Sequence, residues 1–458
     1  MALRPGTKGR TDLPVISLFS GALGLDLGLE KVGFRIAVAV ECNRFASETI
    51  RCNRPDVPVI QRPIEDVSTE EILEGAGLRP GEAAVVTGGP SCQAFSTVGQ
   101  RASMGDPRGV MFRQFLRVVR EARPRFFVME NVRGVLSAAT RHRPLSERGP
   151  GHPPLASEEE LGSAFALIVK ELKGLGYYTV FDLVNAADYG TPQVRERVLF
   201  IGSRDGEDVR LPVPSHAKVA GDGRKPWVTL RRALTGLRDR EPLFSTLSPT
   251  KERFMRLVPE GGNWRDLPRR LQREALGGAF RSWGGRGGFF RRLSWDRPAP
   301  ALTTRPDSKA TMLCHPKELR PLSVREYARL QQFPVRWRFA GGIPQQYVQV
   351  GNAVPVGLGK AIGEALRVVI RRRRRVGRRG EVACANHGLL YRLSKRPRTI
   401  LNPPRMRKVK GLEAACAWLR GLKRRTLKVV PSDGRHGRDG SREEAKATRV
   451  RPAAWRSR

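Results

Sequence analysis

Short apolar runs alternate with amphipathic stretches along the first two hundred residues of the chain. A nearly continuous apolar run predicts a strand buried on both faces, whereas apolar positions three and four apart predict a helix. The expected strands are 15–19, 36–40, 83–86, 125–132, 177–185 and 198–201, and helical patterns include 110–123 and 161–174. Strands that alternate with helices predict an α/β fold built on a doubly wound sheet.

The pattern changes after residue 204. The following ninety or so residues are rich in Gly, Arg, Pro and Trp and show little periodicity, which predicts a loop-rich insert. Helical spacing returns at 323–330 and 356–370, which we expect to complete the core. We therefore expect five parts along the chain. They are a disordered lead-in at 1–12, an α/β domain at 13–204, a smaller loop-rich domain at 205–295, a segment that returns to the core at 296–370 and a basic tail at 371–458.

The chain carries 84 Lys and Arg against 44 Asp and Glu, a formal net charge of +40. Such an excess favours a polyanionic partner, nucleic acid before a membrane surface. Arginine enrichment in a GC-rich genome is the alternative. Residues 371–458 alone hold 28 Lys and Arg against 6 Asp and Glu without an apolar pattern. We expect this tail to be mostly disordered, and either to strengthen nonspecific DNA binding or to be inert.

Six cysteines are scattered without a C-x-x-C pair or a metal-ligand spacing: Cys42, Cys52, Cys92, Cys314, Cys384 and Cys416. This usage is typical of a reducing cytosol. The chain starts without an apolar leader and contains no run of 18 apolar residues. We therefore expect a soluble cytoplasmic protein with no membrane partner and no metal.

Cys92 lies in the segment Thr87-Gly-Gly-Pro-Ser-Cys-Gln, which follows the expected strand 83–86. The glycines and the proline predict a sharp turn that delivers the thiol to the carboxyl edge of the sheet, where α/β proteins bind ligands. A thiol held there is a candidate nucleophile if a neighbour lowers its pKa. The alternative is a small buried apolar residue. Glu130 ends the strand 125–132, so we expect a nucleophile and an acid on one rim.

A second glycine turn, Phe19-Ser-Gly-Ala-Leu-Gly24, follows the first expected strand. Its glycines allow a ligand to lie against the main chain, and Glu41 ends the next strand about 20 residues later. This combination favours an adenosine-type cofactor whose ribose binds Glu41, although a helix N-cap is an equal alternative for this residue. Arg195 and Arg197 are expected on one face of a later strand. From there they can point inward and contact an anion or a carbonyl group, or, equally, they can form a solvated charge pair.

Six motifs occur in one order along the chain: FSGALG at 19–24, GGPSCQAFS at 88–96, ENV at 130–132, QVRER at 193–197, RPLSVREYARLQQFP at 320–334 and GNAVP at 351–355. Together they resemble the C5-cytosine DNA methyltransferase family, from about residue 15 to residue 370. The resemblance implies a Rossmann-like class I methyltransferase fold with a mixed sheet. It also implies that the loop-rich insert is a target recognition domain.

The resemblance implies cytosine in duplex DNA as the substrate and S-adenosylmethionine as the cofactor. Cys92 would add to C6 of the base, Glu130 would hold N3 and the exocyclic amine, and Arg197 would contact O2 with Arg195 nearby. Because C5 is inaccessible inside a duplex, the base must be flipped out. The remaining residues implied to bind the cofactor or the DNA are Phe19, Gly21, Gly24, Glu41, Ile64, Met111 and Asn352 for the cofactor, and Ser96 and Arg108 for the DNA.

Two positions depart from the family pattern. Ser91 replaces the proline that usually precedes the catalytic cysteine, and loss of its fixed φ is expected to slow the reaction more readily than to abolish it. A further family motif corresponds to residues 62–67 of this chain, and it normally has an acid near the adenine of the cofactor. Pro63 stands at the position of this acid, so only Ile64 is carried over from the motif. Glu65 or Asp66 is the alternative acid.

Three functions remain in competition. The leading one is a monomeric, bacterial-type, site-specific DNA (cytosine-5-)-methyltransferase that works with a restriction endonuclease or alone. The second is a tRNA methyltransferase of the same family, against which the long insert and Ser96 argue. The third is a DNA-binding protein of this fold that has lost turnover, for which Ser91 and the basic tail are the support.

Overall fold

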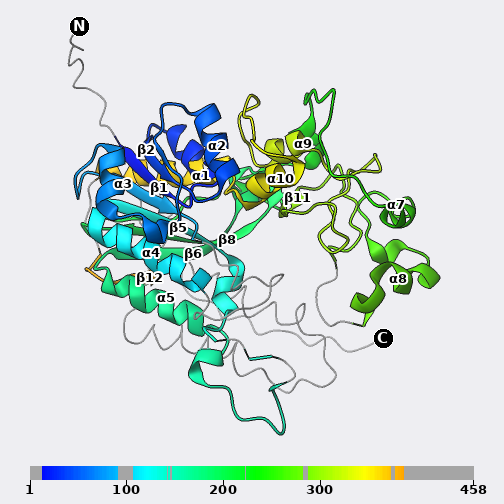
Figure 1. Cartoon of the computed structure of the whole chain (residues 1–458), viewed down its shortest axis with the longest axis horizontal. Helices are drawn as coiled ribbons and strands as arrows, with labels where there is room; N and C mark the ends of the chain where they lie inside the picture. The colour runs from blue at the N-terminus through cyan, green and yellow to red at the C-terminus, as the bar shows by residue number, and fades with distance from the viewer. Residues whose placement is uncertain are drawn as a thin grey trace, which may run out of the picture.

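The computed structural model describes residues 13–90 and 107–385, apart from gaps at 142, 145–146, 222, 282–286 and 373–376; of residues 107–110 it describes the backbone alone. Figure 1 shows a layered α/β domain beside a second lobe that contains helices α7 and α8. No helix among the described residues is both long enough and apolar enough to cross a bilayer.

The α/β domain is built on an eight-stranded sheet in the order β12-β6-β8-β5-β4-β1-β2-β3. All neighbours are parallel except β8, which runs antiparallel to both β5 and β6. The strands are β1 Pro14–Leu18, β2 Arg35–Val40, β3 Val59–Ile60, β4 Val85–Gly88, β5 Phe126–Val132, β6 Tyr178–Asn185, β8 Glu196–Ser203 and β12 Val382–Cys384. The expected doubly wound mixed sheet is therefore confirmed.

Helices cover both faces of the sheet, as the apolar periodicity requires (Figure 1). On one face, α3 Thr69–Ala76, α4 Pro107–Ala122 and α5 Ser163–Gly174 bury apolar side chains in one core cluster. On the other face, α1 Gly24–Glu30 packs against α11 Val356–Arg372 in a second cluster. This last contact depends on glycine, since a Cβ added to Gly28 would lie 2.4 Å from the Val356 carbonyl oxygen.

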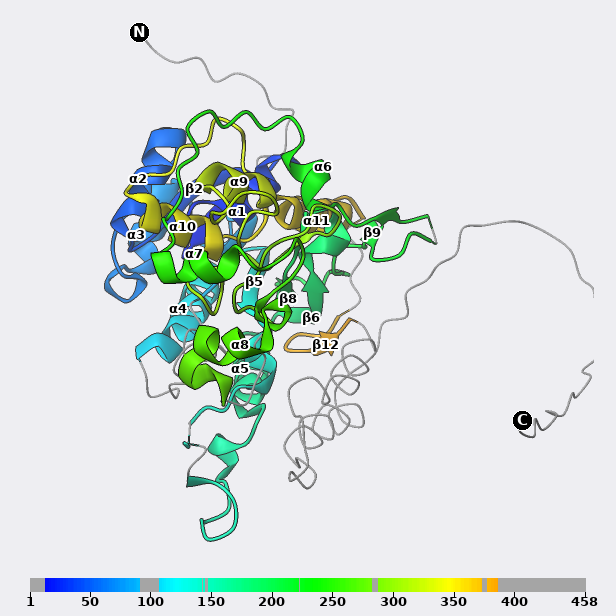
Figure 2. The ribbon, with the colours of Figure 1, turned by 90° about the vertical axis from the view of Figure 1, so that its right-hand side faces the viewer.

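The second lobe has its own apolar core, which includes Phe254, Trp264, Leu276 and Phe290. Another cluster, which includes Leu23, Leu230, Tyr327 and Tyr347, joins the lobe to the α/β domain. The remaining helices and strands are α2 Arg44–Asn53, β7 Gln193–Val194, β9 His216–Ala217, β10 Lys225–Pro226, α6 Leu230–Leu234, α7 Pro249–Met255, α8 Arg269–Leu276, β11 Ala299–Pro300, α9 Val324–Leu330 and α10 Ile343–Asn352. Short 3-10 helices occupy Ile64–Asp66, Arg133–Ser137, Ser157–Glu159, Ala186–Tyr189, Trp264–Asp266 and Gly277–Phe280. Figure 2 shows the β9 segment projecting from the body.

Two segments contain regular structure that the sequence pattern did not indicate. The insert 205–295 contains helices α6, α7 and α8, whose short lengths left little periodicity to detect. The tail 371–458 was expected to be mostly disordered, and within its described part strand β12 extends the sheet beyond β6. A Cβ on Gly377 would lie 2.0 Å from the Tyr178 ring, so this glycine lets the chain return closely over the domain.

Candidate active site

Three parallel strands lie in register near one edge of the sheet, where β1 and β4 end and β5 continues to Val132. Leu18 of β1 pairs with Gly88 of β4, and Gly88 pairs with Met129 of β5. The next residue in each strand or its following turn is Phe19, Gly89 or Glu130. The glycine turn, the start of the cysteine segment and the acid thus meet at this edge, as the sequence predicted. Ser91, Cys92 and Ser96 themselves lie outside the described residues, and the side chain of Arg108, at the start of α4, does as well.

Glu130 forms an ion pair with Arg197 at this edge. The Arg197 Nε and the Glu130 Oε1 are 2.5 Å apart, and only 13% and 12% of the two side chains are exposed. A Cβ added to Gly89 would lie 3.1 Å from Glu130 Oε2. The arginine therefore holds one carboxylate oxygen while the other faces the beginning of the segment that carries Cys92.

Arg195 is directed elsewhere. It lies in a break between β7 and β8, and its guanidinium donates hydrogen bonds to the carbonyl oxygens of Leu302 at 3.1 Å and Gly351 at 2.8 Å. Burial, followed by the charge of Arg197, lowers the pKa of this guanidinium well below its ordinary value. Arg195 thus joins the sheet to the segments that lead back from the second lobe.

Two glutamines reinforce this junction. The Gln193 side chain donates to Gln331 Oε1 at 3.1 Å, and Gln331 donates to the carbonyl oxygens of Val350 and Ala353. These bonds connect β7 with the end of α9 and with α10. The QVRER motif therefore contributes one arginine to the carboxylate and uses its glutamine and other arginine to hold the two parts of the molecule together.

The glycine turn has an unusual backbone. Phe19, Gly21 and Leu23 all adopt positive φ angles, of 52°, 52° and 63°, which non-glycine residues rarely do. A Cβ on Gly24 would lie 2.2 Å from the Val354 carbonyl oxygen, whereas one on Gly21 would meet nothing within 4 Å. Gly24 is thus required for close packing, and Gly21 faces open space that a ligand can occupy.

Glu41 stabilises this turn. Its carboxylate accepts hydrogen bonds from the backbone N–H groups of Gly21 at 2.7 Å and Asn43 at 2.8 Å. The N-cap of α2 is Asn43, whose side chain accepts from the Ala46 N–H. The structure thus assigns the cap to Asn43 and leaves Glu41 at the mouth of the turn.

The other expected cofactor residues come from separate segments of the chain. Phe19, Ile64 and Met111 pack on one apolar cluster, although they come from three separate segments. Asn352 is exposed at the end of α10, directly before the residues that touch Gly24. Glu65 and Asp66 are both exposed. Burial and the charge of Glu41 raise the pKa of the Cys42 thiol, and the charge of Glu65 adds to the increase.

Asp26 is a buried acid near the site that the sequence pattern did not single out. This residue lies in α1 and is only 2% exposed, and burial raises the pKa of its carboxyl to about 6. The signal was available, because an acid between Leu25 and Leu27 interrupts an otherwise apolar helix.

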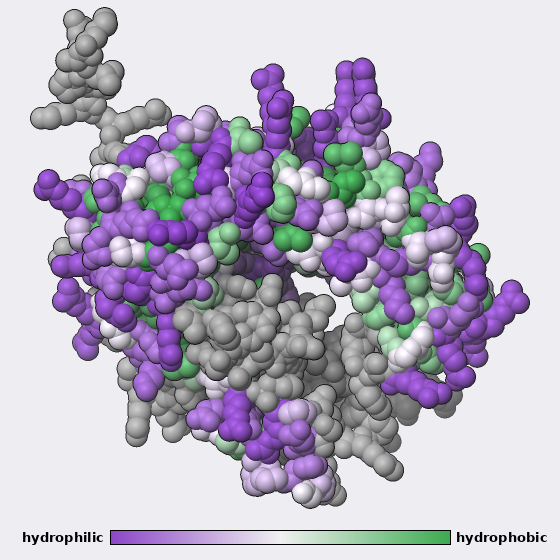
Figure 3. Space-filling view, viewed as in Figure 1, coloured by the Kyte–Doolittle hydropathy of each residue, from purple (hydrophilic) through white to green (hydrophobic). Residues whose placement is uncertain are grey.

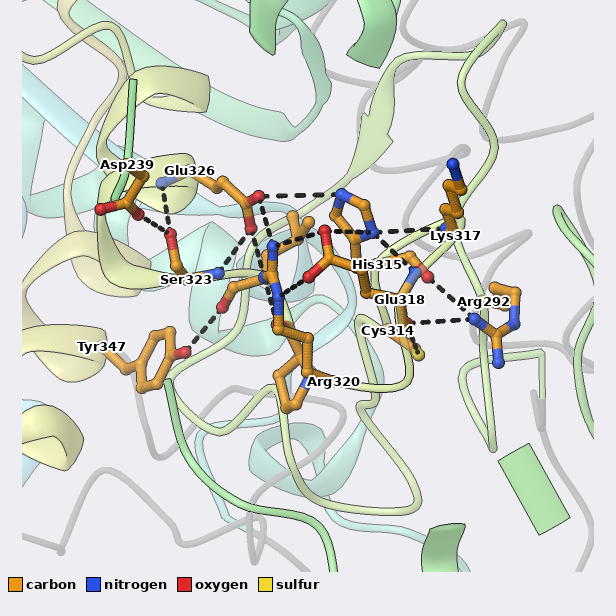
Figure 4. Close-up of polar contacts among 12 residues, drawn as sticks. Asp239, Arg292, Cys314, His315, Lys317, Glu318, Arg320, Ser323, Glu326 and Tyr347 are labelled. Carbon is orange, nitrogen blue, oxygen red and sulfur yellow. Dashed lines mark hydrogen bonds and ion pairs between the residues drawn. The ribbon is translucent and has the colours of Figure 1, made fainter. Parts of the chain in front are cut away.

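The RPLSVRE motif is used for internal contacts (Figure 4). Arg320 donates to both carboxylate oxygens of Glu326, at 2.8 and 2.9 Å, and Glu326 in turn accepts the Ser323 N–H at 2.6 Å. The Ser323 hydroxyl donates to Asp239 at 2.7 Å, and the Tyr347 hydroxyl donates to the Leu322 carbonyl. This network fixes the start of α9 and joins it to α10.

The comparisons with known proteins agree on one family. The model of the C-5 cytosine-specific DNA methylase family matches residues 13–367. The type II methyltransferase M.Sau96I of Staphylococcus aureus is 36% identical over 357 residues, which cover 78% of this chain and 76% of the relative. M.PspPI of a Psychrobacter species is 36% identical over 362 residues, and M.Eco47II of Escherichia coli is 35% identical over 367; each match covers 77% of this chain and 78% of the relative.

Solved structures share the fold. A prophage-encoded DNA modification methyltransferase of E. coli superposes with a TM-score of 0.53 at 24% identity, covering 79% of this chain and all of that one. Strand β12 lies beyond the part that the family model matches. Since that model covers more than half of the chain, and the strands, turns and acid of the matched part converge on one edge, the chain belongs to the C-5 cytosine-specific DNA methylase family.

Proposed function

We propose that the protein is a site-specific DNA (cytosine-5-)-methyltransferase of the type II kind, as its curated relatives are named. The observation that carries the proposal is the Glu130–Arg197 pair, whose second carboxylate oxygen lies beside Gly89, at the start of the Cys92 segment. Nucleophile, acid and arginine are the side-chain types that addition to a pyrimidine ring requires.

The glycine turn fits S-adenosylmethionine. Gly21 faces open space, Glu41 offers carboxylate lone pairs to ribose hydroxyls, and Phe19, Ile64 and Met111 provide apolar surface for an adenine. Asn352 and Gly24 complete the set of residues that we assign to the cofactor. When bound, S-adenosylmethionine supplies the electrophilic methyl group that the cytosine C5 takes up.

The chain's own residues activate the base. The Cys92 thiolate forms a bond to C6, which gives C5 the electron density that it otherwise lacks. Glu130 holds N3 and the exocyclic amine as electrons move into the ring, and Arg197 fixes Glu130 and contacts O2. After C5 has gained its methyl group, its proton leaves to solvent, the electrons of that C–H bond restore the C5–C6 double bond, and the C6–sulfur bond breaks to regenerate the Cys92 thiolate.

DNA is the polyanion that the charge of the chain favours. Arg265, Arg269, Arg270 and Arg273 are exposed on the second lobe, in and before α8. The Arg265 guanidinium lies 4.8 Å from the Trp264 ring centroid, which holds it in place without neutralising it. Figure 3 shows hydrophilic residues along the outer edge of this lobe. We assign DNA to the face of the second lobe that carries these arginines, with Ser96 and Arg108 as contacts near the flipped base.

The decisive experiment is bisulfite sequencing of plasmid DNA from a methylation-deficient host that expresses the full chain. We expect protected cytosines within one short recurrent sequence. The matched control is Cys92→Ser, which should lose protection while the purified protein still binds DNA and S-adenosylmethionine. Protection that persists in this variant would exclude Cys92 as the nucleophile.

Absence of protection in the parent, with cofactor and DNA binding intact, would refute the proposal and favour the inactive DNA-binding protein. Ser91→Pro is then the informative variant, because it restores the fixed φ before Cys92. Methylated tRNA in place of methylated plasmid would instead identify the second alternative. Cleavage of unprotected DNA at the methylated sequence by an extract of the source cells would identify a cognate endonuclease.

A further inference from the structure

Asp26 bridges the two strands that lead into the active site. Its Oδ2 accepts a hydrogen bond from the Ser17 hydroxyl at 2.9 Å, and its Oδ1 accepts one from the Thr87 hydroxyl at 2.8 Å. Ser17 lies in β1 and Thr87 in β4, and each is 1% exposed. One carboxyl group from α1 therefore connects three elements.

The bridge lies at the carboxyl ends of these strands. Ser17 and Thr87 are register partners in the parallel β1–β4 pair. Two residues after Ser17 the chain enters the cofactor turn at Phe19, and two residues after Thr87 it reaches Gly89 beside Glu130. Asp26 itself belongs to the helix that begins directly after the cofactor turn. Any shift of one strand end against the other must strain or break these hydrogen bonds.

Packing alone does not account for an acid at this position. The neighbours of Asp26 in the helix, Leu25 and Leu27, are buried apolar residues, and an apolar side chain would avoid the cost of burying a carboxyl. Buried polar groups whose hydrogen bonds are satisfied restrict the geometry of the surrounding elements. The contacts of Asp26 restrict the relative position of the cofactor turn and strand β4, which the Cys92 segment follows.

We propose that Asp26 is a positioning residue that, through Thr87, sets the segment carrying Cys92 relative to the cofactor turn. The inference rests on the proposed function and deepens it. A small displacement between reacting groups lowers the rate of the chemical step by factors of ten to a hundred, whereas binding of each partner by itself is little affected. The Ser17 contact, in contrast, stays within the elements that flank the cofactor turn.

Matched substitutions at Thr87 test the proposal. Thr87→Val keeps the shape and removes the hydroxyl, and we expect kcat to fall about tenfold or more while the dissociation constant of S-adenosylmethionine stays within about threefold. Thr87→Ser keeps the hydroxyl and should retain kcat within about twofold. Ser17→Ala should mainly weaken cofactor binding. Thr87→Ala is a second hydroxyl-free variant in case Thr87→Val does not fold.

A second measurement needs neither turnover nor cofactor. The alkylation rate of Cys92 by iodoacetamide, followed by mass spectrometry, should change about threefold or more in Thr87→Val and stay at the parent value in Thr87→Ser. Cys52, which is exposed on α2, is the internal control. If the parent does not methylate DNA but the alkylation rate of Cys92 changes in Thr87→Val and not in Thr87→Ser, the proposed function is refuted and the positioning role is supported.

Three results would overturn the positioning role. The first is a kcat and an alkylation rate that are both unchanged in Thr87→Val. The second is an equal loss in Thr87→Val and Thr87→Ser, because side-chain volume would then explain it. The third is a multiplicative loss when Asp26→Leu and Thr87→Val are combined, since Asp26→Leu removes both acceptor oxygens and changes that break one connection should not add.

Discussion

Asp26→Asn should change how the stability of the protein depends on pH. The folded protein raises the pKa of this carboxyl from its ordinary value of 3.8 to about 6, chiefly through burial and against the opposing hydrogen bonds from Thr87 and Ser17. That difference corresponds to about 3 kcal/mol at 1.36 kcal/mol per pH unit. It is the free energy that ionisation of Asp26 costs the folded state.

The sign follows from proton binding. Between pH 4 and pH 6 the folded protein holds a proton on Asp26 that the unfolded chain has released, so this residue makes stability fall as pH rises. Above pH 6 the cost is fully present, and below pH 4 it is absent. Asparagine has no proton to lose, so its stability should not contain this contribution.

Urea unfolding of the parent and of Asp26→Asn, followed by tryptophan fluorescence from pH 4 to pH 8, measures the effect. We expect the free energy of unfolding of the variant, minus that of the parent, to increase by about 3 kcal/mol over this range. Glu74→Gln at an exposed position of α3 is the control for removing a carboxyl that stays in water. A difference between parent and Asp26→Asn that does not vary with pH would refute the reasoning.

Three further changes test other parts of the structure. Arg195→Met leaves the carbonyl groups of Leu302 and Gly351 without their donor and should lower the urea unfolding free energy by about 1–3 kcal/mol; no loss would mean that these bonds do not hold the junction. Arg320→Ala removes the buried cation that pairs with the Glu326 carboxylate and should lower the unfolding free energy by about 3–5 kcal/mol in the same assay; a loss below about 1 kcal/mol would contradict a buried pair. A chain that ends at residue 385 should keep its melting temperature and its target sequence but show a flatter salt dependence of nonspecific DNA binding. A chain that ends at residue 376 should also melt at a lower temperature, because loss of β12 exposes the edge of β6. Equal melting temperatures of the two chains would show that β12 adds no stability.

The apolar pattern was sufficient to predict six of the eight strands of the sheet. A parallel strand covered on both faces must be apolar along nearly its whole length, and the runs that overlap β1, β4 and β5 satisfied this condition. Because parallel strands present their carboxyl ends at one edge, the residues after them were also predictable neighbours. Phe19, Gly89 and Glu130 meet there as expected. The roles of Cys92, Ser96 and Arg108 stay predictions.

Local pattern could not assign partners. The alternation of Arg195 and Arg197 predicted one shared face, but the strand breaks at Arg195, and only Arg197 reaches Glu130. The carbonyl groups that bind Arg195 belong to residues more than a hundred positions later in the chain. Which side chain meets which group across such a distance depends on how the lobes pack.

The sequence by itself determined where most strands lie along the chain, the position of the glycine turn and the acid, and the family of the protein, because these follow from local periodicity and contiguous motifs. Only the tertiary structure decided that Glu41 holds the turn, that Asp26 connects β1 with β4, and that β12 extends the sheet. The physical reason is the same in each case. These features depend on hydrogen bonds between segments that are distant in the chain and become neighbours only when the apolar faces are buried.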